Sequence, residues 1–90
     1  MTCSVTFDFG HSNFCATAQN QDGIIIGLFD RKFEKSTTDE IISEEFKKWL
    51  LEVSSKHGLC LLRCPDRSDE KNYRICRGFF VNNNSILIFN

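Results

Sequence analysis

Four possible zinc ligands lie close together in the second half of the chain: His57, Cys60, Cys64 and Cys76. Thiolate and imidazole are the ligands that Zn²⁺ takes in structural sites. Zinc ribbons, however, place two cysteines on one tight turn with two residues between them, and this spacing is absent. On an extended strand, Cys60 and Cys64 would lie roughly 13 Å apart unless Pro65 reversed the chain. Buried cysteines that pack as small apolar side chains are the simpler interpretation, so we expect no metal or cofactor and keep a zinc-binding module as an alternative.

The first predicted turn holds the other candidate for chemistry. A nucleophilic cysteine needs a base within hydrogen-bond reach, and His11 could reach Cys15 across this turn. The alternative is a solvated turn beside a packed thiol. The chain contains no Gly-x-Ser-x-Gly, Walker or His-Glu-x-x-His motif. We therefore expect no enzyme, and keep as an alternative a small enzyme or ligand-binding domain that uses Cys15 and His11.

Residues 77 to 81, Arg-Gly-Phe-Phe-Val, partly resemble the first ribonucleoprotein motif of the RNA-recognition fold. In that motif aromatic side chains stack on bases. The segment departs from the motif at Phe80, where a small residue should stand, and at Asn83, where the final aromatic is missing. The family also has two helices, whereas the pattern of this chain predicts one. An RNA-binding module is thus a further alternative, and nucleic acid is not the expected partner.

Basic residues gather in one stretch although the whole chain is nearly neutral. Eleven Lys and Arg stand against twelve Asp and Glu, for a formal charge of −1, which argues against bulk binding of nucleic acid. Arginine makes bidentate contacts to carboxylates and phosphates and is enriched at interface hot spots. The partner-binding candidates are therefore Arg63, Arg67, Lys71, Arg74 and Arg77, with Phe80. The alternative is an exposed loop that its own acidic residues, Asp66, Asp69 and Glu70, neutralise.

Length and composition indicate a single domain over residues 1–90. Ninety residues allow one modest core, and 41% hydrophobic and 26% charged residues exclude disordered and collagen-like chains. Five cysteines cannot all pair within the chain, and the N-terminal residues lack the pattern of a signal peptide. No apolar run approaches the roughly 20 residues that a membrane span needs. We expect a cytoplasmic protein with reduced thiols and no membrane contact.

Strict alternation of apolar and polar residues predicts a strand over residues 2–9. Turn residues follow at 10–13, a second strand covers 14–19, and Asp22-Gly23 marks a turn before a third strand at 24–29. Gly27 interrupts this third strand, which indicates a bulge or a close backbone approach.

A helix is predicted from about residue 37 to residue 57. Thr37 and Glu40 have the spacing of a capping box, and Gly58 can end the helix. Its predicted apolar stripe consists of Ile41, Ile42, Phe46, Trp49, Leu50 and Val53. Strands are predicted again at 59–63, 73–81 and 86–89. The expected fold is α+β, with a mostly antiparallel sheet of five to six strands, one helix packed on one face, and the order βββ-α-βββ.

This architecture leaves apolar surface without a cover. A helix of this length is roughly 28 Å long and covers about half of one sheet face, yet several strands carry apolar residues on both sides. Either the sheet closes on itself, or a second copy or another protein covers it. We expect a small inhibitor or regulator that binds a protein stoichiometrically, or else a homodimer. Phage and mobile-element inhibitors such as anti-CRISPR proteins, and immunity or adaptor proteins, share this size range.

Overall fold

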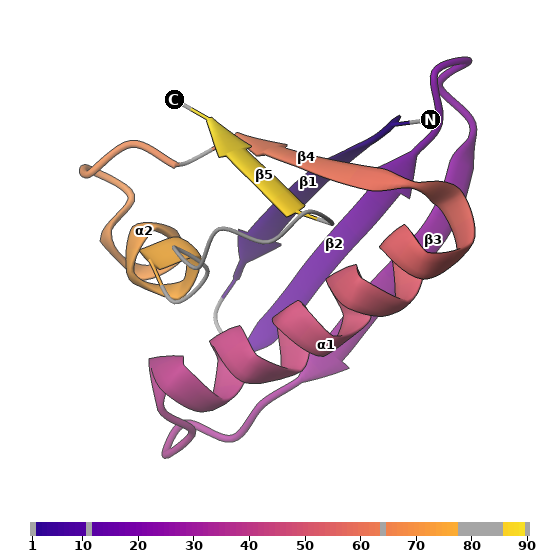
Figure 1. Cartoon of the computed structure of the whole chain (residues 1–90). Helices are drawn as coiled ribbons and strands as arrows, with labels where there is room; N and C mark the ends of the chain where they lie inside the picture. The colour runs from indigo at the N-terminus through magenta and orange to yellow at the C-terminus, as the bar shows by residue number, and fades with distance from the viewer. Residues whose placement is uncertain (1, 11, 64, 78–85, 90) are drawn as a thin grey trace.

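The computed structural model describes residues 2–10, 12–63, 65–77 and 86–89 (Figure 1). Its elements in chain order are β1 (Thr2–Phe9), β2 (Asn13–Gln19), β3 (Ile25–Lys32), α1 (Asp39–His57), β4 (Leu59–Arg63), α2 (Glu70–Arg77) and β5 (Ile86–Phe89). The α+β class is confirmed. None of the helices in these ranges is both long and apolar enough to cross a membrane.

The sheet is mixed, so the prediction of a mostly antiparallel sheet is wrong. Its strand order is β3-β2-β1-β4-β5. The hairpins pair β1 with β2 and β2 with β3 in antiparallel fashion, whereas β1 with β4 and β4 with β5 are parallel. The reason is that a helix precedes each of β4 and β5 and returns the chain to the starting end of the sheet, which is how parallel neighbours are connected.

The strand predicted at residues 73–81 is wrong over 73–77, which belong to α2, and 78–81 lie outside the described residues. The N–H of Tyr73 donates to the carbonyl of Asp69 at 2.9 Å, as in a first helical turn. Asn72, Ile75 and Cys76 are all buried, and their spacing of three and four residues places them on one helical face. The order βββ-α-βββ is therefore replaced by βββ-α-β-α-β.

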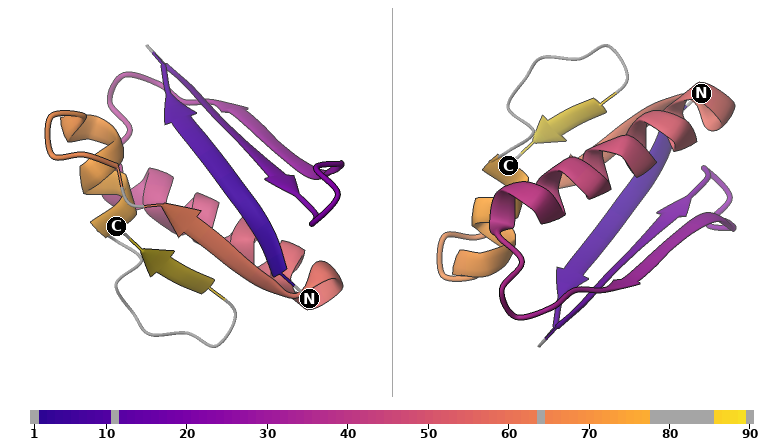
Figure 2. Two further views of the ribbon diagram at one scale, coloured as in Figure 1. Left: turned by 90° about the horizontal axis from the view of Figure 1, so that it is seen from above. Right: turned by 90° about the horizontal axis from the view of Figure 1, so that it is seen from below.

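Helix α1 lies across one face of the sheet (Figure 2). Its N-cap is Thr38, one residue later than the capping box predicted, and the Thr38 side chain accepts from the N–H of Ile41. Gly58 ends the helix with a φ of 101°, as predicted. The predicted stripe is confirmed at its buried members, but Ile41 is 53% exposed because it lies off the face that meets the sheet.

One core takes up most of the described phenylalanines. Phe46 of α1 is fully buried and lies 4.8 Å from the ring of Phe14 and 5.0 Å from that of Phe7. Phe29 and Trp49 extend this cluster toward the edge of the sheet. These aromatic side chains thus fill the layer between α1 and the sheet.

On β1 and β2 the uncovered face of the sheet is mostly polar, so the expected apolar second face does not extend across these two strands. Its residues on β1 and β2 include Ser4, Thr6, Asp8, Cys15 and Thr17. The large exposed hydrophobic residues gather instead at the start of β3, where Ile24 is 59%, Ile25 59% and Leu28 60% exposed. Among the described residues of the sheet, the most exposed large apolar side chains thus lie at this end of β3.

Gly27 in the middle of β3 lies at a bulge, as predicted, and faces α1. The register of β2 and β3 shifts between Ala18 and Gln19, which leaves a bulge beside Gly27. A Cβ on Gly27 would lie 3.4 Å from both Trp49 Cζ2 and Val53 Cγ2. The missing side chain therefore lets α1 approach β3 closely.

Candidate functional site

Cys60 and Cys76 of the predicted zinc cluster pack in the hydrophobic core. Cys60 and Cys76 are fully buried, and the Sγ of Cys60 donates to the carbonyl of Leu50 at 3.5 Å. Burial, together with the neighbouring Cys3, raises the pKa of the Cys60 thiol to about 11, so it is uncharged at neutral pH. No group of three or more potential ligands occurs among the described residues, and Cys64 lies outside them.

Cys15, the candidate nucleophile, lies on the uncovered face of the sheet and is exposed. Its neighbours in register are Asp8 on β1 and Asp30 on β3. Reactive thiolates usually stand beside Lys, Arg or protonated His, whereas both of these neighbours are acidic. His11 lies outside the described residues, so the Cys15 and His11 pair stays a prediction.

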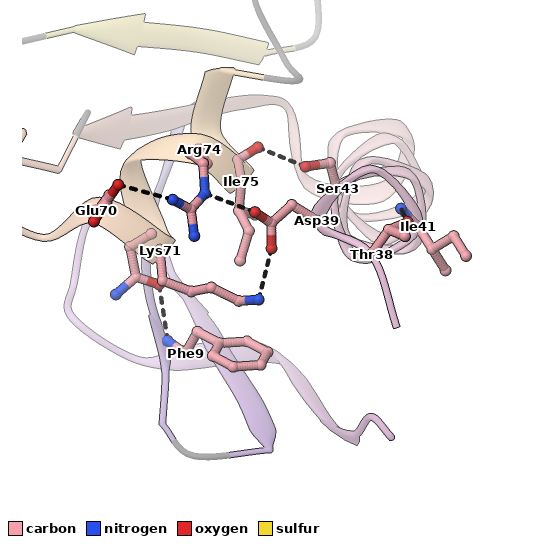
Figure 3. Close-up of polar contacts among 10 residues, drawn as sticks. Phe9, Thr38, Asp39, Ile41, Ser43, Glu70, Lys71, Arg74 and Ile75 are labelled. Atoms are coloured by element: carbon pink, nitrogen blue, oxygen red, sulfur yellow. Dashed lines mark hydrogen bonds and ion pairs between the residues drawn. The ribbon is translucent and has the colours of Figure 1, made fainter. Parts of the chain in front are cut away.

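Two of the basic partner-binding candidates already have partners within the chain (Figure 3). Lys71 Nζ lies 2.6 Å from Asp39 Oδ1, and Arg74 Nε lies 2.8 Å from Asp39 Oδ2. Arg74 also contacts Glu70 at 3.0 Å, and Lys71 Nζ lies 4.7 Å from the centre of the Phe9 ring. Both side chains therefore hold α2 against the first turn of α1.

Two further basic candidates, Arg63 and Arg67, lie in and after β4. Arg63 is exposed at the end of β4, and the Arg67 guanidinium lies 5.9 Å from the centre of the Tyr73 ring. Arg77 is the last residue of α2, and Phe80, with the segment that resembles the RNA-binding motif, lies outside the described residues. A partner contact at any of these positions stays a prediction. The alternative of internal neutralisation is supported at Arg74 through Glu70.

A buried asparagine that the sequence did not single out completes the attachment of α2. Asn72 is 2% exposed, and its Oδ1 accepts from the N–H of Phe9 at 2.8 Å. Its Nδ2 donates to Asp8 Oδ1 and to Asp69 Oδ2, both at 2.9 Å. The amide thereby joins the end of β1 to the start of α2. The spacing of Asp69 and Asn72, at the start of a helix, is the only sequence signal that points to it.

The ion pairs of Asp39 make the stability of the chain depend on pH. Burial pushes the pKa of Asp39 up, but hydrogen bonds and charge from Lys71 and Arg74 outweigh it and hold the pKa below its ordinary value. A carboxyl with a lowered pKa stabilises the folded state above its unfolded pKa, and this contribution is lost as pH falls through the folded pKa.

We expect Asp39→Asn to lower the free energy of unfolding by about 1 kcal/mol at neutral pH, because the contacts are partly exposed. Urea unfolding of both proteins at neutral pH and at about pH 2 measures it, since the difference should vanish once Asp39 is protonated. Glu70→Gln, at a carboxylate that is 79% exposed, is the matched control with little effect. An equal loss at both pH values would contradict the ionic role of Asp39.

The exposed apolar residues lie on the outermost strand of the sheet, β3. The N–H of Phe33 donates to the carbonyl of Ser12 at 2.7 Å, and opposite residues of an antiparallel pair alternate between bonded and non-bonded positions. Phe29, four residues before Phe33, is thus bonded to β2. The N–H and C=O groups of Leu28 and Asp30 consequently point away from β2, toward the open edge.

A groove of about 220 Å³ runs between β3 and α1, and we call it the β3–α1 groove. Its β3 side is formed by Ile26, Gly27 and Leu28. Its α1 side is formed by Trp49, Glu52, Val53, Lys56 and His57. Trp49 is only partly buried. The edge of β3 therefore has apolar side chains on both faces of the sheet.

Comparison with known proteins does not assign this site: no family model, no curated protein and no solved structure matches the chain.

Proposed function

We propose that the protein is a small inhibitor or regulator that binds another protein stoichiometrically, and that β3 is its contact strand. The observation that carries the proposal is the exposure of three large aliphatic side chains, Ile25 and Leu28 on the outermost strand of the sheet and Ile24 directly before it. Natural proteins usually protect such edges with charges, proline or a covering segment, because exposed apolar edges aggregate. Residues 24–29 of this edge carry neither charge nor proline, and an exposed apolar stretch of this kind supports a role in binding.

The distribution of charge along β3 fits an interface. Residues 23–29 contain no charged side chain, and charges begin only at Asp30, Arg31 and Lys32. Arg31 is paired with Glu45 of α1 and stacks over the Phe29 ring. An apolar centre with charged residues at its rim is the usual composition of a protein interface. Inhibition by association, without turnover, needs only such a surface.

The binding strand can be tested with the partner that the protein captures from the cells that produce it. The purified pair should form a complex of fixed stoichiometry, and Leu28→Arg should weaken it about 30-fold or more, the effect expected of an interface hot spot. Ser4→Arg is the matched control, since Ser4 is exposed on the same face but lies on β1. Titration calorimetry measures both.

Two results would count against this function. A complex that Leu28→Arg leaves intact would place the contact elsewhere on the molecule. A dimer of the chain alone that Leu28→Arg dissociates, with no other protein captured, would show that β3 serves the homodimer instead.

A further inference from the structure

We propose that the partner supplies an extended strand that adds to the sheet beside β3, with apolar side chains on its uncovered face. This inference rests on the proposed function and specifies how the partner is held. It follows from three features of the edge: the direction of its backbone groups, the groove on the covered face, and the aliphatic side chains on the uncovered face.

The backbone of β3 sets the form of the ligand. The N–H and C=O groups of Leu28 and Asp30 point to the open edge at a regular two-residue spacing. Only an extended segment presents its own N–H and C=O groups at that spacing, and edge strands bind peptides in this way. The eight residues of β3 are long enough for several such bonds.

The side chains beside this edge set the chemistry of the ligand. In an added strand, alternate side chains would face α1 and enter the β3–α1 groove over Gly27, against Trp49 and Val53. The intervening side chains would lie on the uncovered face, next to Ile25 and Leu28. The uncovered surroundings are apolar, whereas the groove also holds Glu52, Lys56 and His57. The ligand segment opposite residues 25–29 therefore carries apolar side chains on its uncovered face and both apolar and polar side chains toward the groove.

A second copy of the chain fits this edge poorly. If two β3 strands paired antiparallel about Leu28, Ile25 would face Arg31 and Ile24 would face Lys32. If they paired about Ile26, Asp30 would face Asp22. The first arrangement puts apolar against charged residues and the second brings like charges together, which is unfavourable across strands. Pairing about Gly27 would place Leu28 opposite Ile26, but the bulge beside Gly27 breaks the alternation of faces, so that Ile25 on the uncovered face would lie opposite Phe29 on the covered face. We therefore infer that the strand comes from a different protein.

Peptides selected for binding provide the probe. A library of random peptides of about twelve residues, long enough to span the edge, is selected against the immobilised full chain, and the binders without tryptophan are synthesised. Trp49 is the only tryptophan and lines the groove, so its emission reports binding. Each peptide is then N-methylated at one backbone position at a time. Methylation should weaken binding about tenfold or more at alternate positions, because each methyl removes one hydrogen bond to β3 and blocks the approach of the strand.

A pair of chain variants tests the same contact from the other side. Asp30→Pro removes the N–H that points to the edge, and proline is tolerated on an edge strand when its missing N–H faces solvent. We expect about tenfold weaker peptide binding for Asp30→Pro. Asp30→Ala removes the same carboxylate but keeps the N–H, so its binding should be unchanged. Circular dichroism verifies that both variants fold.

The outcomes separate this inference from the proposed function. Selected peptides that bind with alternating sensitivity to methylation and shift the Trp49 emission support strand addition, even if Asp30→Pro does not fold. Failure to select any peptide, methylation effects without alternation, or a folded Asp30→Pro that binds like Asp30→Ala would overturn it. If the captured partner is lost on Leu28→Arg but retained by Asp30→Pro, protein binding through β3 stands and strand addition fails.

Discussion

Replacing Phe46 with alanine is expected to lower the free energy of unfolding by about 3–5 kcal/mol, the usual cost of removing a buried phenylalanine. Phe46 is fully buried, and its ring lies within 6.1 Å of the rings of Phe7, Phe14, Phe29 and Trp49. Its removal leaves a cavity where α1 meets the sheet, and the rigid ring cluster cannot close it. Urea unfolding followed by far-ultraviolet circular dichroism measures the loss.

Ile41→Ala is the matched control on the same helix. Ile41 is 53% exposed, so its truncation should change the free energy of unfolding by less than about 0.5 kcal/mol. If Ile41→Ala cost as much as Phe46→Ala, the face of α1 that meets the sheet would be assigned wrongly.

The second large effect is expected for Asn72→Ala, which should cost about 2–3 kcal/mol. The change removes three hydrogen bonds and leaves the N–H of Phe9 without its side-chain acceptor. Asp8 and Asp69 would also lose the amide that lies between their carboxylates. Because Asn72 joins β1 to α2, the loss should be largest for α2.

Residue-resolved hydrogen exchange distinguishes this loosening of α2 from general destabilisation. The Phe9 amide and the α2 amides should exchange faster in Asn72→Ala, while amides of the β1–β2 hairpin that pair near Val5 and Ala18 keep their protection. Asn13→Ala, at an exposed asparagine of β2, is the control and should change neither. An unchanged Phe9 amide in Asn72→Ala would contradict the role of the buried amide.

Local sequence patterns predicted the first half of the fold, because each element there is specified by its own residues. Alternation defined β1 and β2, and Asp22-Gly23 marked a turn in which Gly23 has a φ of 79°. The pattern failed at α2, since its buried face consists of only three residues and a run of apolar residues follows Arg77. The mixed sheet was also beyond local patterns, because strand pairing depends on how the helices return the chain.

The candidate site was likewise predictable only in part from the sequence. The apolar residues on both sides of β3 are visible in the sequence, and they led to the prediction of a protein partner. The position of this strand at the edge of the sheet was not visible, since it depends on the strand order. Likewise, the sequence placed Arg74 among free basic residues, whereas in the fold it contacts Asp39, 35 positions earlier in the chain.

The most direct test of β3 as the contact strand is hydrogen exchange of the chain alone and in complex with its captured partner. We expect slowed exchange on binding to be concentrated in residues 24–32, with the amides of Leu28 and Asp30 among the most protected. Protection concentrated in residues 63–77, at the basic candidates, with exchange in β3 unchanged, would contradict it.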